Sequence, residues 1–100
     1  MVLGRVWTQV RYYIDPTTGL PHIYEHSVSE GEVEEVLSEP TQDMRGRENS
    51  RIAIGQTSAG RYLKVIYVPG PLPGACFVIT AHELGPKAKR AIRRKRKGRK

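Results

Sequence analysis

The sequence predicts a single α+β domain, in which two N-terminal helices and a basic C-terminal helix pack an antiparallel sheet of three or four strands. Three patterns predict this class: segments of period-two alternation, a helix-capping sequence followed by apolar residues at helical spacing, and Pro/Gly-rich connections between the strands. The expected order of elements is β-α-α-β-β-β-α. A chain of 100 residues has room for one modest core, which we expect within residues 1–93, with residues 94–100 as a basic tail.

The first strand is expected over Val6–Ile14, where β-branched and aromatic residues alternate with polar ones. The turn-forming run Asp15–Gly19 then ends it. Residues Leu20–His26 predict a short helix that turns three apolar side chains inward, namely Leu20, Ile23 and Tyr24.

The second helix has the best local signal in the chain. Ser29 is expected as its N-cap, with Glu32 three residues later as the reciprocal partner of a capping box. Val28 and Val33 flank this pair as a hydrophobic staple, and a buried stripe continues through Val36 and Leu37. Pro40 marks the end of the helix.

The C-terminal half alternates between strand and turn signals. Residues 41–50 are polar and predict a loop or a weak edge strand, whereas residues 51–54, 62–68 and 76–81 predict strands. The Pro/Gly-rich run Pro69–Gly74 cannot sustain a central strand and is expected as a connection. A final helix is expected from Pro86, with an apolar stripe formed by Leu84, Ala88, Ala91 and Ile92.

The positive charge is concentrated at the C-terminus. Residues 1–86 hold seven basic and ten acidic side chains, a balance of −3, whereas the last fourteen residues carry a charge of +10. Lys and Arg at this density bind phosphates by releasing counterions, which favours a nucleic acid as the partner. Charge alone leaves open a merely solubilising terminus, an acidic protein partner or an anionic membrane surface.

Several classes of function lack support in the sequence. There is no apolar run of 18 residues and no secretory signal pattern, so we expect a cytoplasmic protein without a membrane partner. The single cysteine, Cys76, lies in an apolar run and is expected in the core. No cofactor-binding motif is present, and His22 with His26, spaced i and i+4, supplies too few ligands for a metal site. We therefore expect no cofactor and no metal.

The residue types required for metal-free RNA cleavage occur near the predicted C-terminal helix. Such cleavage needs a base for the 2′-hydroxyl proton, an acid for the leaving oxygen, and cations for the phosphate charge. His82 and Glu83 could transfer the proton, and Arg61 and Lys64 could hold the phosphate. The alternative is that Arg61 and Lys64 are solvated strand residues and that His82 caps the helix.

Four segments resemble the BrnT-like toxin family and its uncharacterised relatives. They are His22–Leu37, Arg51–Thr57, Ala59–Val65, and Val78–Leu84 followed by the Lys/Arg-rich helix. The resemblance implies a RelE-like fold and a type II toxin, that is, a metal-independent endoribonuclease that inhibits translation and is neutralised by a small antitoxin protein.

The resemblance also assigns roles to particular residues. The family's histidine corresponds to His26 and its arginine to Arg61, while its basic helix corresponds to residues 87–94, which include Lys87, Arg90, Arg93 and Arg94. Two positions differ from the family. Ser27 replaces a glycine, at a cost of about 1 kcal/mol if the backbone there is left-handed, and His82 replaces what is more often an arginine.

Two hypotheses follow from these patterns. In the first, the chain is an RNA-cleaving toxin that uses His82, His26, Glu83 and Arg61. In the second, it is a non-catalytic module that binds nucleic acid or protein through its sheet, with the tail adding affinity. The sequence leaves the oligomeric state open.

Overall fold

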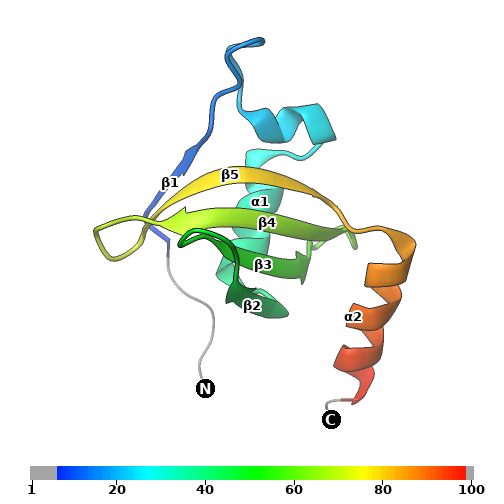
Figure 1. Cartoon of the computed structure of the whole chain (residues 1–100). Helices are drawn as coiled ribbons and strands as arrows, with labels where there is room; N and C mark the ends of the chain where they lie inside the picture. The colour runs from blue at the N-terminus through cyan, green and yellow to red at the C-terminus, as the bar shows by residue number, and fades with distance from the viewer. Residues whose placement is uncertain (1–6, 99–100) are drawn as a thin grey trace.

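The protein is an α+β domain built on a five-stranded mixed sheet (Figure 1). The computed structural model describes residues 7–98, with side chains as far as Ile92. The elements follow one another as β1 (Gln9–Tyr12), the 3-10 helix η1 (His22–His26), α1 (Glu30–Ser38), β2 (Gln42–Arg45), β3 (Arg51–Gln56), β4 (Tyr62–Pro69), β5 (Ala75–Glu83) and α2 (Pro86–Gly98).

The predicted antiparallel sheet of three or four strands is wrong. The strand order is β1-β5-β4-β3-β2, and β1 pairs with β5 in parallel, whereas the other pairs are antiparallel. The additional strand is β2, which forms a hairpin with β3 in the region expected as a loop or weak edge. β1 is held in place by side chains that the local pattern does not specify: Trp7 Nε1 donates to the Leu37 carbonyl at 3.1 Å, and Val10 and Tyr12 pack on the core.

The expectation of two N-terminal helices packing the sheet is also wrong, because residues 22–26 form only a 3-10 helix. Only Ile23 of its predicted inward residues is buried, and Leu20 and Tyr24 are 51% and 44% exposed. The Leu20 carbonyl accepts a hydrogen bond from the Asp15 N–H instead of starting a helix. Ser27 ends the 3-10 helix in the left-handed conformation, with φ 58° and ψ 39°.

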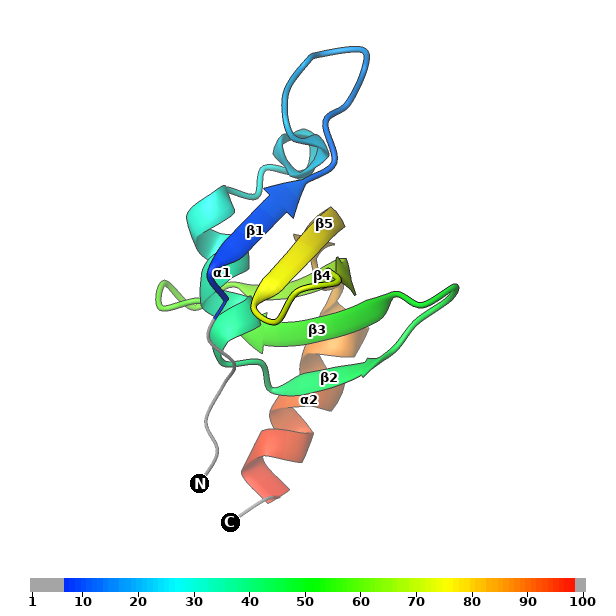
Figure 2. The same ribbon diagram turned by 90° about the vertical axis from the view of Figure 1, so that its left-hand side faces the viewer.

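The capping signal at the start of α1 is confirmed. Ser29 Oγ accepts from the Glu32 N–H at 3.2 Å, and the Glu32 carboxylate accepts from the Ser29 N–H at 3.0 Å. The helix therefore begins where the capping box requires and lies on one face of the sheet (Figure 2). The buried core between helix and sheet consists of Ile23, Val28, Val33, Val36, Leu37, Ala53, Leu63, Val65, Tyr67, Cys76, Val78 and Ala81.

The helix α2 follows β5 and descends from that end of the sheet (Figure 1). It packs on Ile54, which alternates along β3 with the core residue Ala53, so it contacts the side of the sheet opposite α1. Leu84 and Ile92 are buried against Ile54 and Tyr62, but the alanines of the expected apolar stripe, Ala88 and Ala91, are exposed. Only the ends of that stripe therefore anchor the helix.

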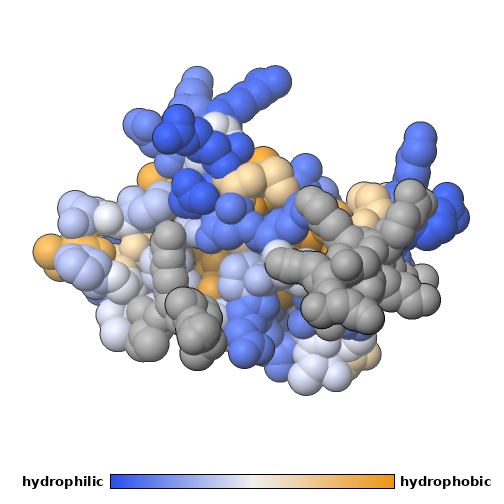
Figure 3. All heavy atoms as spheres, turned by 90° about the horizontal axis from the view of Figure 1, so that it is seen from below, coloured by the Kyte–Doolittle hydropathy of each residue, from blue (hydrophilic) through white to orange (hydrophobic). Residues whose placement is uncertain are grey.

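On the rest of this side of the sheet, which we call the open face, no helix of the described residues is packed. Strand register places together on it Arg11, Met44, Ile52, Lys64, Ile66, Phe77 and His82. Met44 and Phe77 are each 39% exposed. Seen from below, hydrophobic atoms reach the molecular surface between hydrophilic side chains (Figure 3).

Within residues 7–98, no helix combines the length and apolar character needed to cross a bilayer.

The left-handed backbone at Ser27 predicts that Ser27→Gly stabilises the protein. Glycine adopts a positive φ without the steric cost that a Cβ imposes, so we expect a gain of about 1 kcal/mol in the free energy of unfolding, measured by urea denaturation. The matched control is Ser38→Gly in the last turn of α1, which should instead destabilise by about 0.5 kcal/mol because of glycine's backbone entropy. A loss of stability in Ser27→Gly would contradict the prediction.

Candidate functional site

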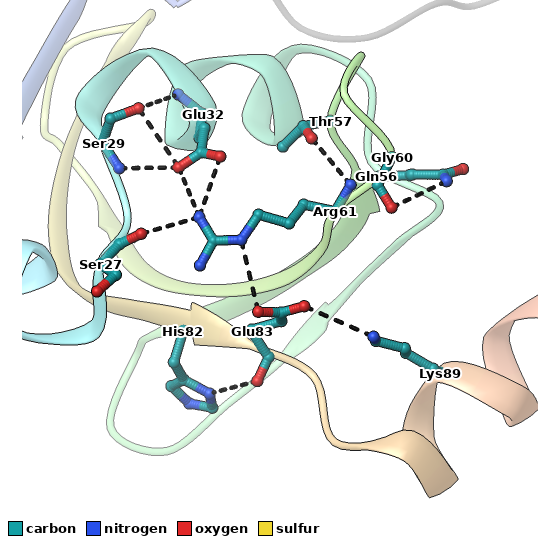
Figure 4. A network of polar contacts seen from close by, with 10 residues as sticks. All are labelled: Ser27, Ser29, Glu32, Gln56, Thr57, Gly60, Arg61, His82, Glu83 and Lys89. Atoms are coloured by element: carbon teal, nitrogen blue, oxygen red, sulfur yellow. Dashed lines mark hydrogen bonds and ion pairs between the residues drawn. The ribbon is translucent and has the colours of Figure 1, made fainter.

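The guanidinium of Arg61 lies at the centre of a polar network that joins α1, β4, β5 and α2 (Figure 4). Its Nη1 donates to both Glu32 carboxylate oxygens, at 2.9 and 3.0 Å, and to the Ser27 carbonyl at 2.8 Å. Its Nε lies 3.5 Å from Glu83 Oε1. Arg61, predicted to hold phosphate, is thus engaged by two carboxylates and a carbonyl.

The charges of this network stabilise one another. The hydrogen bond with Glu32 raises the pKa of Arg61. The Ser29 N–H and, after it, the Arg61 guanidinium hold the pKa of the Glu32 carboxyl below its usual value. Glu32 therefore both caps α1 and receives the arginine, so the start of the helix and the start of β4 are fixed by one carboxylate.

Glu83 bridges two cations at the end of β5. Its Oε1 faces Arg61 Nε, and its Oε2 lies 3.5 Å from Lys89 Nζ in α2. This carboxylate, predicted to assist catalysis, links the first turns of α2 to the sheet (Figure 4). Its position fits a residue that orients the basic helix.

All three histidines of the chain lie in one row that ends beside this network. The rings of His22 and His26 are 5.3 Å apart, and those of His26 and His82 are 5.7 Å apart, with edge-to-face geometry in both pairs. Asp15 Oδ2 lies 3.1 Å from His22 Nδ1 at the far end of the row. We call Asp15, His22, His26 and His82 the histidine row.

The two ends of the histidine row differ in their surroundings. At one end, hydrogen bonding from the Thr17 N–H and then from His22 lowers the pKa of Asp15. At the other end, His82 is the cross-strand partner of Lys64 on the open face, and its Nδ1 lies 3.5 Å from the Glu83 carbonyl. His26 and His82, both predicted site residues, are therefore brought together, and Lys64 lies beside His82.

The remaining predicted phosphate ligands lie on α2. Lys87 and Arg90 are exposed, and the side chains of Arg93 and Arg94 lie outside the described residues.

Sequence reasoning missed Asp15 as a member of the histidine row. The spacing of His22 and His26 was a signal for one half of the row, but nothing local indicated that Asp15 or His82 would join it. No group of three or more His, Cys, Asp or Glu side chains within the described part of the chain is placed to hold a metal ion.

Comparisons of the chain with protein-family models, with curated proteins and with solved structures give no match.

The double role of Glu32 predicts how Glu32→Gln behaves. Glutamine can still accept a capping bond but carries no charge for Arg61, so we expect a loss of about 1 kcal/mol in the free energy of unfolding at pH 7. Because the folded pKa of Glu32 lies below its unfolded value of about 4.3, this contribution is present above pH 4.3 and disappears as the pH falls through the folded value.

Urea denaturation between pH 2 and pH 7 tests this assignment. The wild type should lose stability on acidification, and Glu32→Gln should lose less over the same interval. The matched control is Glu25→Gln, because Glu25 makes no hydrogen bond or ion pair to other described residues and is exposed. Parallel pH profiles for the wild type and Glu32→Gln would refute the role assigned to the Arg61–Glu32 pair.

Proposed function

We propose that this protein binds RNA through α2 and the open face and cleaves it without a metal ion, using His26 and His82 as the proton-transferring pair. The observation that carries the proposal is the approach of these two imidazoles, 5.7 Å between ring centroids, next to Lys64 on the open face. At this separation the two rings are in edge-to-face contact, so the proposal places the phosphodiester beside the pair, where one ring reaches the 2′-hydroxyl and the other reaches the leaving 5′-oxygen.

The proposed reaction is the internal transfer of a phosphoryl group. One imidazole takes the proton of a ribose 2′-hydroxyl, and the 2′-oxygen attacks phosphorus. The bond from phosphorus to the 5′-oxygen breaks, and the other imidazole, in its protonated form, gives that oxygen a proton. The products are a 2′,3′-cyclic phosphate and a free 5′-hydroxyl, so no water, metal or redox partner is consumed. Lys64 offsets the charge that develops on the phosphate oxygens.

Binding in this proposal comes mainly from the cations of α2. Lys87 and Arg90 are exposed on the described part of the helix, and the sequence adds further Lys and Arg as far as Lys100. Arg61 serves as a positioning residue because its guanidinium is held by Glu32 and Glu83. Arg61 therefore acts on the phosphate indirectly in this proposal, whereas the sequence predicted that it holds the phosphate itself.

The resemblance to BrnT-like toxins extends the proposal to biological context. On that basis, the RNA is one whose cleavage inhibits translation, and a small antitoxin protein neutralises the chain.

Replacing either imidazole should abolish most of the cleavage. We expect His26→Gln and His82→Gln each to lower the rate of RNA cleavage by 10²-fold to 10⁴-fold, as for loss of a general acid or base. The assay is cleavage of end-labelled RNA in the presence of a chelator, with circular dichroism to check folding. Glu25→Gln is the control for the preparation and should cleave like the wild type. Cleavage that is unchanged in both histidine variants would come from a contaminant and would refute the proposal.

A second function, binding without cleavage, is favoured by one observation: Arg61, the arginine at the candidate centre, is already paired with carboxylates. A site built for cleavage commonly holds phosphate with a guanidinium, and here that group stabilises the fold. In this alternative the protein binds RNA, shows no cleavage in chelator, and retains its affinity in both histidine variants.

Truncation of the tail tests the electrostatic part of either function. Residues 94–100 contain six Lys and Arg side chains, so their removal should make the slope of log K against log salt shallower by up to about 4 for single-stranded RNA. Fluorescence anisotropy between 50 mM and 300 mM salt measures the slope. An unchanged slope, together with unchanged urea denaturation, would show that these residues do not contact phosphate.

A further inference from the structure

A hollow of about 290 Å³ lies at the end of the open face away from α2. It is bounded by β1, by the start of β5 and by the connection after β4, and it is lined by Gln9, Arg11, Leu72 and Phe77 among others. Figure 1 shows this connection at the opposite end of β5 from α2. The volume is at the lower limit of small-molecule sites, so the hollow suits one flat ring system better than a drug-sized ligand.

The polar and aromatic side chains of the hollow face the same side as α2. Arg11 and Phe77 are register partners in the parallel β1–β5 pair. Their neighbours Val10 and Tyr12 on β1 and Cys76 and Val78 on β5 pack into the core, which directs Arg11 and Phe77 to the open face. Phe77 is 39% exposed. An aromatic ring and a guanidinium plane therefore lie side by side on the face that α2 adjoins.

These groups have unused binding capacity. Among the described residues, the side chains of Gln9 and Arg11 make no hydrogen bond or ion pair. Gln9 offers an acceptor and two donors, and Arg11 offers a planar set of donors. No acidic side chain lines the hollow. A purely apolar ligand would leave the amide and guanidinium unpaired, so the lining favours a ligand that is both aromatic and polar.

The hollow is held in shape by the connection that borders it. The Gly70 N–H donates to the Ala75 carbonyl at 2.7 Å, and the Ala75 N–H donates to the Leu72 carbonyl at 3.1 Å. A Cβ at Gly70 would lie 2.9 Å from the Ala75 Cβ, so the two strand ends approach as closely as glycine allows. Pro69, Pro71 and Pro73 further restrict the backbone. Binding of a ligand therefore costs little conformational entropy in this connection.

We propose that this hollow is a base pocket, in which one unpaired RNA base stacks on Phe77 and presents its polar edge to Gln9 and Arg11. The inference rests on the proposed RNA binding and adds base selectivity to it. The phosphates of the strand are held by α2 and Lys64 at one end of the open face, and the base pocket selects a nucleotide at the other.

The experiment uses four fluorescent 2′-O-methyl RNA octamers, one for each base. Their blocked 2′-oxygen cannot attack phosphorus, so the intact wild-type protein can be used. We expect the wild type to bind the best homopolymer at least fivefold more tightly than the worst. Phe77→Leu should weaken binding of the preferred octamer by about tenfold, the loss expected for one base stack. Phe77→Tyr should keep both affinity and preference.

A pair of arginine variants separates base reading from charge. Arg11→Gln should reduce the preference among the four octamers. Arg47→Gln, which removes the same charge from the exposed turn between β2 and β3, should leave that preference unchanged. Urea denaturation of each variant checks that the fold is retained.

The outcomes distinguish failure of the base pocket from failure of the proposed function. Salt-dependent binding with equal affinity for all four octamers would overturn the base pocket alone. A preference that survives in Phe77→Leu and Arg11→Gln would do the same. Absence of RNA binding by the wild type would overturn both. Loss of cleavage in the chelator assay, with base-selective octamer binding intact, would remove the catalytic proposal and leave the base pocket standing.

Discussion

The pairing of Arg61 with Glu32 is the interaction on which the arrangement of the candidate site depends. Both Glu32 carboxylate oxygens accept hydrogen bonds from the same guanidinium nitrogen, Nη1. One of these oxygens also accepts the Ser29 N–H bond that completes the capping box of α1. The same nitrogen reaches the Ser27 carbonyl, which fixes the segment between η1 and α1. Since His26 immediately precedes Ser27, the position of that imidazole against His82 is set by an ion pair that neither histidine touches.

Charge balance explains why this centre tolerates so many ionised groups. Two carboxylates and two cations alternate in the order Glu32, Arg61, Glu83 and Lys89. All four side chains retain partial solvent exposure, so the cost of removing each charge from water is moderate. The alternation leaves little net charge at the centre. In the proposed function, the attraction of phosphate therefore rests on Lys64 and on the cations of α2.

Local signals in the sequence were sufficient for the parts of the fold that local contacts create. The capping box at Ser29 and the strand around Val65 depend on neighbours a few residues away, and both are present. The parallel β1–β5 pair depends on Trp7 reaching Leu37 and on strands more than sixty residues apart, which no short pattern encodes. The 3-10 helix was mistaken for an α-helix because apolar spacing alone does not reveal that the Leu20 carbonyl is used by Asp15.

The candidate site was predictable in its residue types and less so in its connections. His26 and His82 were both selected as candidates, yet their approach requires η1 to lie against β5, which is a tertiary contact. The sequence predicted that Arg61 is available to a ligand. Its carboxylate partners lie 29 and 22 positions away in the chain, so no local pattern indicated that they pair with it. Ion-pair partners at such separations are brought together by the topology of the fold. A sequence pattern can therefore identify the cation but not the carboxylates that pair with it.

The two outermost strands, β1 and β2, contain only four residues each. A sheet with an uncovered apolar side is prone to stack or to extend through its unpaired backbone groups. Here each edge strand offers only a short row of backbone groups to a second molecule, and Arg45 at the end of β2 adds a charge to one edge. Short edge strands therefore limit edge-to-edge association of a sheet whose open face carries the exposed side chains of Met44 and Phe77.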